Sequence, residues 1–178
     1  MNRRTPRITI AAGLPPWVRR QLPRELGRRL SRAGRRLGLT PEELASAAIH
    51  LVDDPTIARL NHDHMGKRGP TDVLSFPSAA ASFATSEEPW FTPPAPALGD
   101  IVISWPAITR QAAGDTGTAH LDEATVLAIH GIGHLLGHDH RRRGEGRAMH
   151  RLELRALAAA RVADIARPYG LRPARSAR

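Results

Sequence analysis

The sequence predicts an α+β fold, a single domain in which one mixed, four-stranded sheet packs with about five helices. Two patterns carry this prediction. Several short segments have the alternating or continuous apolar character of strands, and between them apolar residues recur every three or four positions, as in amphipathic helices. The elements follow in the order β-α-β-α-β-β-α-α-α, which indicates an α+β domain. We expect residues 1–166 to form this domain, with residues 77–98 as a surface insertion and residues 167–178 as a basic, disordered tail.

The first strand is predicted at residues 7–11, where polar and apolar side chains alternate. An apolar stripe at helical spacing then predicts an amphipathic helix whose inward residues are Leu22, Leu26, Leu30, Ala33 and Leu37. Pro23 fits best in the first turn of this helix and Gly38 near its end. The polar face of the helix is either a solvated surface or an RNA-facing one, and it carries Arg24, Arg28, Arg29, Arg32, Arg35 and Arg36.

The second strand is predicted at Ala45–Val52, with sequence ASAAIHLV. A helix follows it, begun by Pro55, because proline is favoured in the first turn, where its missing N–H has no helical partner to lose. Either Asp53 or Asp54 caps this helix, since a carboxylate oxygen there accepts from a free backbone N–H. The sequence thus places a helix directly after the second strand.

A basic loop at residues 66–70, with sequence GKRGP, precedes a third strand at Asp72–Phe76. Residues 77–98 are rich in proline, alanine and serine and have no periodicity, which is typical of a surface insertion. Leu98-Gly99 then leads into a fourth strand at Asp100–Ser104. Its apolar character predicts a buried position in the sheet.

Three helices are predicted after the fourth strand. Trp105-Pro106 opens the first, which continues to about Ala113, and the second is long, from Asp122 to Leu136, and stops at Gly137. After a basic loop the last helix covers about residues 147–166. The long helix is important because it carries His130 and His134, two of the four histidines described below.

The composition limits the possible chemistry. The chain has no cysteine, which excludes disulfides, thiolate catalysis and sulfur-ligated metal sites, so any metal must be held by nitrogen and oxygen. No run of 18 apolar residues is present, and residues 1–9 lack the apolar core of a secretory signal, so we expect a cytoplasmic protein that does not bind membranes. The alternative for the arginine-rich start is a transit peptide.

The charge balance favours a polyanionic partner. The chain has 26 basic and 17 acidic residues and a net charge of +9, and every basic residue except Lys67 is an arginine. A codon bias explains the use of arginine in place of lysine, but it does not explain the excess of bases over acids. Nucleic acid is therefore the favoured partner class.

Four of the nine histidines fall in the segment His130–His140, with sequence HGIGHLLGHDH. His130 and His134 are one helical turn apart and about 40° apart around the axis, so both imidazoles can point at one ion. Gly137 falls where a helix ends in a left-handed residue, and the chain can turn back there and bring His140 to a third corner. We therefore predict one Zn²⁺ per chain, held by His130, His134 and His140.

Three imidazoles leave one tetrahedral position open for water, as in catalytic zinc sites, where bound water can reach a pKa of about 7. Three points stay open at this stage. His138 is a rival to His140 as third ligand, Asp139 is either an outer-shell partner of a ligand or a turn residue, and nickel, copper or cobalt also bind three imidazoles. The prediction is a hydrolytic metal site whose water is the nucleophile.

The histidine spacing matches the signature of the metzincin peptidases, His-Glu-x-x-His-x-x-Gly-x-x-His. Here Gly131 stands where those enzymes have their general-base glutamate. A zinc peptidase without this carboxylate lacks the group that deprotonates water and protonates the leaving amine. Phosphodiester cleavage depends less on it, because the metal and cationic side chains stabilise the charges that develop. Gly131 therefore favours phosphate esters over peptide bonds.

With these residues described, the chain resembles the YbeY family of endoribonucleases, which mature ribosomal RNA. The resemblance spans about residues 45–155, and it is carried by Leu51–Asp54, Leu60-Asn61, Pro70–Pro77 (PTDVLSFP), Leu98–Ile103 (LGDIVI) and His130–His140, with weaker agreement at Met149, Leu152 and Glu153. It implies a zincin-like α+β fold and one zinc ion on the three motif histidines. It also implies cleavage of single-stranded RNA and action on ribosomal RNA of the small ribosomal subunit, in 16S rRNA 3′-end maturation and ribosome quality control.

The chain departs from the family pattern at two positions. The family usually has tyrosine at the position of His138, and it commonly carries an arginine, thought to engage the RNA phosphate, at the position of Met65. Lys67 keeps its place, and Arg68 lies in the same loop. Our hypothesis is that Arg68, together with Lys67, supplies the missing positive charge. These two residues would then be the catalytic cations.

Two alternatives accompany the endoribonuclease interpretation. The first is a ribosome-assembly factor that binds RNA with weak or no cleavage, an alternative that the loss of the arginine at Met65 favours. The second is a zinc peptidase, against which Gly131 argues.

Overall fold

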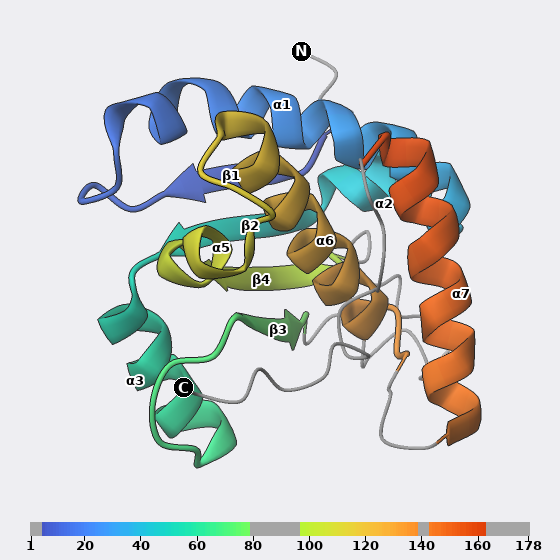
Figure 1. The fold of residues 1–178 in the computed structure, drawn as a ribbon. Coiled ribbons are helices and arrows are strands. Elements are labelled where there is room, and N and C mark those ends of the chain that lie inside the picture. Colours follow the sequence, from blue (N-terminus) through green and yellow to red (C-terminus); the bar gives the residue numbers. More distant parts are fainter. Residues whose placement is uncertain (1–4, 79–96, 139–142, 163–178) are drawn as a thin grey trace, which may run out of the picture.

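The computed structural model describes residues 5–78, 97–138 and 143–162. In this part of the chain three parallel strands lie in the order β1 (Arg7–Ile10), β2 (Ala47–Val52) and β4 (Gly99–Ser104). Strand β3 (Val73–Pro77) pairs antiparallel with β4 at the edge of the sheet. The predicted mixed, four-stranded sheet of an α+β domain is therefore confirmed (Figure 1).

Six α-helices and one short 3-10 turn accompany the sheet within the described residues. They are α1 (Pro16–Gly34), η1 (Arg35–Leu37), α2 (Pro41–Ala45), α3 (Asp54–Met65), α5 (Trp105–Gln111), α6 (Gly117–Leu135) and α7 (Arg143–Ala160). Figure 1 shows α1, α6 and α7 grouped on one face of the sheet, whereas α3 lies beyond β3 and β4. In the described residues, no helix is both long and apolar enough to span a membrane.

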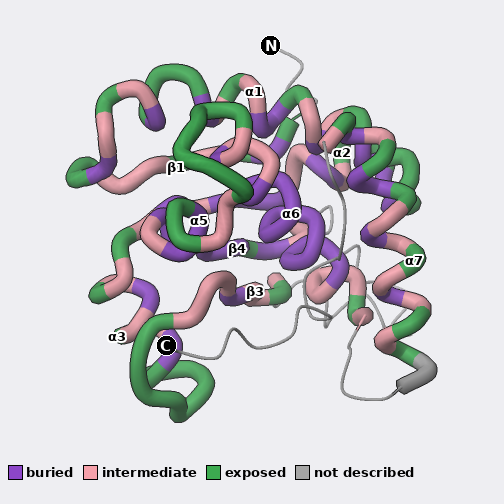
Figure 2. The backbone as a smooth tube through the Cα atoms, viewed as in Figure 1, coloured by how far each residue is buried: buried purple, intermediate pink, exposed green. Residues whose placement is uncertain are grey.

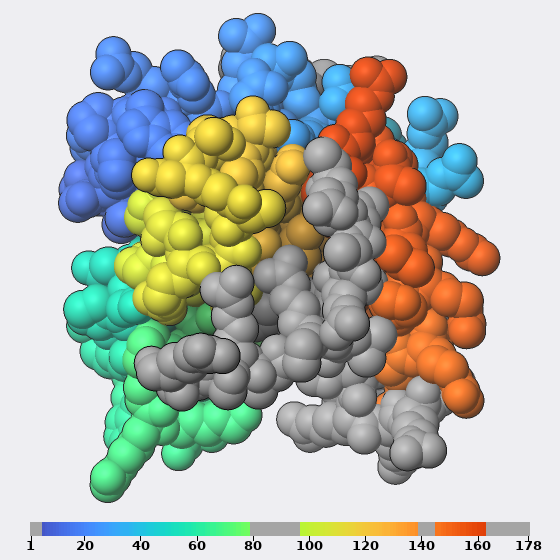
Figure 3. All heavy atoms as spheres, viewed as in Figure 1, coloured from blue at the N-terminus to red at the C-terminus, as the bar shows by residue number. Residues whose placement is uncertain are grey.

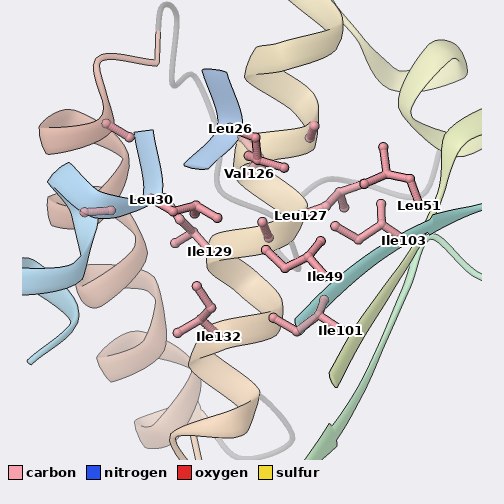
Figure 4. Close-up of a cluster of buried hydrophobic side chains, with 14 of the residues drawn as sticks. Leu26, Leu30, Ile49, Leu51, Ile101, Ile103, Val126, Leu127, Ile129 and Ile132 are labelled. Carbon is pink, nitrogen blue, oxygen red and sulfur yellow. The ribbon is translucent and has the colours of Figure 1, made fainter. Parts of the chain in front are cut away.

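The main core lies between the sheet and α6. Alternate residues of the two central strands point to this face, and Ile49, Leu51, Ile101 and Ile103 are all fully buried. Figure 4 shows α6 between these strand residues and the leucines of α1. Figure 2 shows that α6 is buried along most of its length. Such a helix is held by packing on several sides and gives a rigid support for any side chain it carries.

The opposite face of the sheet has a smaller apolar cluster. Ile57 from α3 packs with Leu74 of β3 and Val102 of β4, and all three side chains are buried. Leu60 of α3 and Phe76 of β3 pack against them. This cluster fixes α3, and with it the start of the basic loop that follows, against the edge of the sheet.

Helix α1 begins earlier than predicted, at Pro16 rather than near Pro23, which lies inside it. A proline inside a helix costs about 3 kcal/mol because it removes one hydrogen bond and crowds the preceding turn. Val18 is fully buried one turn before Leu22, so the apolar stripe that ends at Leu37 starts before the proline. Burial of the extended stripe offsets the cost of Pro23, and Pro16 occupies the favoured first position.

Helix α2 was not predicted, and it delays the start of β2 from Ala45 to Ala47. The Thr40 hydroxyl accepts from the Glu43 N–H at 3.2 Å, and the Thr40 N–H donates to the Glu43 carboxylate at 2.8 Å. The backbone hydrogen bond to Thr40 is the main cause that holds the pKa of Glu43 below its ordinary value. This Thr-x-x-Glu capping box, with Pro41 at the first helical position, was the signal in the sequence.

Two further helices have different bounds from those predicted. Helix α6 begins at Gly117 rather than Asp122, because the Thr116 hydroxyl caps it by accepting from the Ala119 N–H at 3.1 Å. Helix α7 begins at Arg143 and ends at Ala160. Most of the predicted insertion, residues 79–96, and the predicted tail, residues 167–178, lie outside the described residues.

Candidate metal centre

Two of the predicted ligands come together on the C-terminal half of α6. The Nε2 atoms of His130 and His134 are 3.0 Å apart, and their rings are nearly perpendicular, with centroids separated by 4.6 Å. His130 is buried and His134 is half-buried. The one-turn spacing thus directs both imidazoles at one point, as the sequence predicts.

A carboxylate that we did not predict as a site residue orients His130. The Glu153 Oε1 atom lies 2.7 Å from His130 Nδ1, and both side chains are about 3% exposed. An ionised carboxylate only accepts hydrogen bonds, so Nδ1 carries the proton and Nε2 presents a lone pair toward His134. Metal-binding histidines commonly have this partner on their second nitrogen.

The sequence contained a signal for Glu153. It falls on the apolar stripe of α7, in helical spacing with Met149, Ala156, Leu157 and Ala160, which are all buried. A carboxylate on the buried face of a helix needs a partner, because an unpaired buried charge costs several kcal/mol. The stripe predicts a buried partner, but it does not say that the partner is His130, 23 residues earlier.

The two histidines fit a zinc-type ion. In a tetrahedral site with Zn–N distances of about 2.0–2.1 Å, two ligand nitrogens lie about 3.3 Å apart, close to the 3.0 Å between His130 and His134 Nε2. Neutral imidazole nitrogens are also ligands that zinc prefers. His140 and Asp139 lie outside the described residues, within which no group of three histidines or carboxylates is placed to hold a metal. The third ligand therefore stays a prediction.

The predicted helix end at Gly137 is confirmed, with this residue in the left-handed conformation. Gly137 has φ of +82°, and its N–H donates to the His134 carbonyl at 3.0 Å, while the His138 N–H donates to the Gly133 carbonyl at 3.0 Å. These two bonds are the Schellman arrangement, which favours glycine because a Cβ clashes in the left-handed region. The turn at Gly137 directs the chain out of the helix three residues before His140 in the sequence.

Gly131 packs so closely on the sheet that any side chain at this position would force its neighbours to shift. A Cβ at this position would lie 2.7 Å from Ile101 Cγ2 and 3.2 Å from Ser75 Oγ. The Ser75 hydroxyl, from the PTDVLSFP segment of β3, also donates to the Gly131 carbonyl at 3.2 Å. The glutamate of a metzincin therefore has no space here, and the matching segment serves to seat the histidine helix on the sheet.

The basic loop has a defined backbone. Gly66, with φ of +64°, ends α3, and the buried Asn61 amide donates to the Gly69 carbonyl at 2.9 Å. Lys67 and Arg68 are both exposed between these fixed points. In Figure 1 this connection between α3 and β3 lies at the lower left, apart from the lower end of α6. Among the described residues neither cation forms a hydrogen bond or ion pair with His130 or His134, so the catalytic role of Lys67 and Arg68 stays a prediction.

The aspartates after β2 are structural. The Asp53 carboxylate accepts from the Thr56 N–H at 2.9 Å, so Asp53, rather than Asp54, caps α3. Asp54 accepts from the Ser104 hydroxyl at 2.5 Å and from Arg110 at 2.8 Å. Burial raises the pKa of Asp54, but these two hydrogen bonds outweigh it and hold the pKa below its ordinary value. Asp54 thereby ties α3 to β4 and α5.

Glu153→Gln is expected to weaken zinc binding roughly 10–100-fold, because the amide holds the His130 proton less strongly than a carboxylate does. Zinc affinity measured by competition with a chelator checks this, and circular dichroism checks that the variant is folded. Glu42→Gln, an exposed glutamate of α2, is the matched control. Unchanged zinc affinity in Glu153→Gln would show that Glu153 only stabilises the packing of α7.

Comparisons with known proteins show which family this chain is similar to. The family model for "Endoribonuclease YbeY" matches residues 23–161. A relative of the same name from Alkalilimnicola ehrlichii is 42% identical over 71% of this chain and 70% of its own length, and one from Parvibaculum lavamentivorans is 40% identical over 72% and 68%. The solution structure of TM1509 from Thermotoga maritima is 23% identical, covers 86% of this chain and 87% of its own, and has a TM-score of 0.49.

The region that the family model matches contains the elements that form the candidate site. It includes the capped helix α3, the loop after it, strand β3 and the histidine helix with its glutamate partner. The resemblance inferred from the sequence is therefore confirmed over most of the chain. The chain belongs to the endoribonuclease YbeY family.

Proposed function

We propose that the protein is a zinc-dependent, single-strand-specific endoribonuclease of the cytoplasm that acts in 16S rRNA 3′-end maturation and in ribosome quality control. The observation that carries this proposal is the pair of imidazole nitrogens 3.0 Å apart, backed by a buried glutamate, in a member of an endoribonuclease family. The net charge of +9 supports a nucleic-acid substrate.

In this proposal His130 and His134, with the predicted His140, hold one zinc ion. When bound, the ion would polarise a phosphoryl oxygen and lower the pKa of a coordinated water. Glu153 keeps the proton of His130 on Nδ1, so that Nε2 remains a ligand. Lys67 and Arg68 neutralise the phosphate charge of the bound strand.

A peptidase is less well supported. Helix α6 has no carboxylate at the position that follows His130 in the sequence, where Gly131 abuts Ile101 and Ser75. Peptide hydrolysis needs a group that gives a proton to the leaving amine, whereas a leaving alkoxide can be stabilised by a metal alone. The packing of Gly131 therefore supports phosphate-ester chemistry.

A second candidate function is an RNA-binding assembly factor with little cleavage. Met65 stands at the position where the family commonly has an arginine, and this apolar side chain is 47% exposed at the end of α3. It supplies no charge to a phosphate. If neither Lys67 nor Arg68 compensates, the protein would bind ribosomal RNA and cleave it poorly.

One experiment separates these functions. The protein is stripped of metal with a chelator, reloaded with zinc, and incubated with labelled single-stranded RNA, duplex RNA and casein. We expect cleavage of single-stranded RNA alone, lost on stripping and regained with zinc. Binding of RNA without cleavage in the zinc-loaded protein would support the assembly factor, and hydrolysis of casein with intact RNA would support the peptidase.

The role in 16S maturation needs its own substrate. Small-subunit particles that contain 3′-extended 16S rRNA are incubated with zinc-loaded protein, and the 3′ ends are mapped. We expect the extension to be removed at one position. Cleavage of free single-stranded RNA with no change in the particles would leave the nuclease activity but contradict the proposed role in maturation.

Arg68→Ala is expected to lower the rate of RNA cleavage about tenfold, because the proposed phosphate cation is lost, with zinc content unchanged. Single-turnover cleavage of a labelled RNA measures this rate. The control is Arg59→Ala, which removes an exposed arginine from the preceding helix. If Arg68→Ala cleaves as fast as the parent, Arg68 does not compensate for Met65.

A further inference from the structure

We propose that the exposed arginines of α1 and η1 form a second RNA-binding surface, separate from the metal centre, that holds the same strand at a distance from the cleavage point. The inference rests on the proposed endoribonuclease function, because it concerns how that enzyme binds its substrate. The surface consists of a row formed by Arg20, Arg24, Arg28, Arg32 and Arg36, with Arg19 and Arg35 beside it, and we call it the arginine row.

The arginine row is strongly basic. All seven side chains are exposed, and Glu25, which pairs with Arg28, is the one acidic residue in the sequence of α1 and η1. The general preference of this chain for arginine does not explain the lack of acids. Helices α2 and α3 carry exposed acidic residues, namely Glu42 and Asp63. A helix face that only needs to be solvated can mix both signs, whereas a surface for a polyanion excludes acids.

The spacing of the row suits a repeating anion. Its members are four residues apart, so successive arginines rise by about 6 Å along the helix. The four members in α1, Arg20, Arg24, Arg28 and Arg32, each lie two residues from a buried leucine, namely Leu22, Leu26 or Leu30. Two residues correspond to about 200° around the axis, so these arginines lie on the side opposite the core. The result is a ridge of guanidinium groups, a group that can bind a phosphate through two parallel hydrogen bonds. Within this ridge Arg28 also pairs with Glu25.

The ridge is fixed relative to the metal centre. The helical spacing predicts Arg29 on the polar face of α1. Instead, Arg29 turns toward the core and pairs with Asp122 of α6, and the two side chains are 13% and 18% exposed, respectively. This contact corrects the predicted face, and it joins α1 to the helix that carries His130 and His134. Figure 3 shows α1, in blue, along the upper edge of the molecule. Because α1 is tied to α6, the row and the histidines keep a constant separation.

That separation predicts how long a strand must be to reach both places. Asp122 and His134 are about 18 Å apart along α6, and the outer side of α1 lies about one helix diameter, or 10 Å, from Asp122, so the two places are at most about 28 Å apart. A stacked strand that rises about 3.4 Å per nucleotide covers this distance with roughly eight nucleotides. The arginine row should therefore affect long RNA and not very short RNA.

The test compares two double variants of the full-length, zinc-loaded protein. Arg24→Gln with Arg32→Gln removes two charges from the row, and glutamine keeps a high helix propensity. Arg7→Gln with Arg59→Gln removes two exposed charges elsewhere. Both variants have a net charge of +7, two below the +9 of the parent, so any difference between them depends on position. Circular dichroism confirms that each is folded.

Binding and cleavage are measured with single-stranded RNA of about five and about twenty nucleotides, one shorter and one longer than the span above. For the long RNA, the row variant should lower the salt slope of log K by about 1.4, because each phosphate contact on a single strand contributes about 0.7. Its loss of cleavage efficiency should be about tenfold greater on the long RNA than on the short RNA. The control variant should show neither effect.

Two results would contradict the proposal that the arginine row binds RNA. One is an unchanged salt slope on long RNA, which would leave the row as a solvated face or a site for an acidic protein. The other is an equal loss on both RNA lengths. If the parent cleaves neither RNA, the proposed nuclease function fails, but the salt slope of binding still decides whether the row holds RNA.

Discussion

Replacement of His134 by alanine is expected to abolish zinc-dependent cleavage of single-stranded RNA. Loss of an outer-shell partner already costs roughly 10–100-fold in metal affinity, and loss of a direct ligand should exceed this. The cause is geometric. The Nε2 atoms of His130 and His134 are 3.0 Å apart and point at one ion, which His130 alone cannot hold. Zinc content and single-turnover cleavage, measured on the same preparation, check the prediction.

The fold of this variant should survive, so that the loss can be assigned to the site. His134 is only half-buried, and it lies in the last turn of α6, where alanine is well tolerated. RNA binding should persist, because the exposed arginines are unchanged. His62→Ala, an exposed histidine of α3, is the matched control for general loss of a histidine.

The same assay decides the third ligand. If His140 completes the site, His140→Ala should lose zinc and cleavage as His134→Ala does, whereas His138→Ala should retain both. The reverse result would make His138 the third ligand. Retention of zinc by His134→Ala itself would contradict the predicted metal centre, whatever the family of the chain.

The local features of the site could be predicted from the sequence because they depend on short-range geometry. A four-residue spacing on a helix fixes the relation between His130 and His134, and the αL preference of Gly137 fixes the turn. Both require only the residues between them. The same is true of the Asp53 cap, which depends on the Thr56 N–H three residues away.

The long-range features could not be predicted in the same way. Glu153 and His130 meet because α7 packs against α6, and the pattern of α7 alone does not specify which helix it meets. The spacing of α1 places Arg29 on the polar face. This prediction is wrong because its partner, Asp122, is 93 residues away, and the local pattern does not indicate such a contact. The start of α1 at Pro16 depends on burial of Val18 by the rest of the domain. In each case tertiary packing decides between local alternatives that the sequence leaves open.

Gly131 shows both kinds of information at one position. From the sequence, the glycine indicates chemistry, because it stands where a peptidase has its general base. In the structure, it has a steric cause, because a Cβ would lie 2.7 Å from Ile101 Cγ2 in the fully buried core. The close approach of α6 to β4 therefore requires glycine at position 131, and for the same reason it excludes a carboxylate there. A peptidase-like glutamate would require the histidine helix to move off the sheet.

The second large expected effect follows from this contact. Gly131→Ala should lower the free energy of unfolding by about 1–3 kcal/mol, which is the usual cost of overpacking. The higher helix propensity of alanine offsets a part of this loss. For a chain of this size that corresponds to a fall in Tm of roughly 3–10 °C. Gly131→Glu adds a buried charge with no partner and should leave little folded protein. Thermal unfolding followed by circular dichroism measures both.

A control and a double variant make the cause specific. Gly117→Ala, in the first turn of the same helix, places its Cβ no closer than 3.9 Å to a neighbour, so it should be neutral or stabilising. Ile101→Ala removes the atoms that the new Cβ meets. The combination of Gly131→Ala with Ile101→Ala should therefore lose less stability than the two single losses added together. Strict additivity would mean that Gly131 is not held by its contact with Ile101, and the steric argument against the peptidase would fail with it.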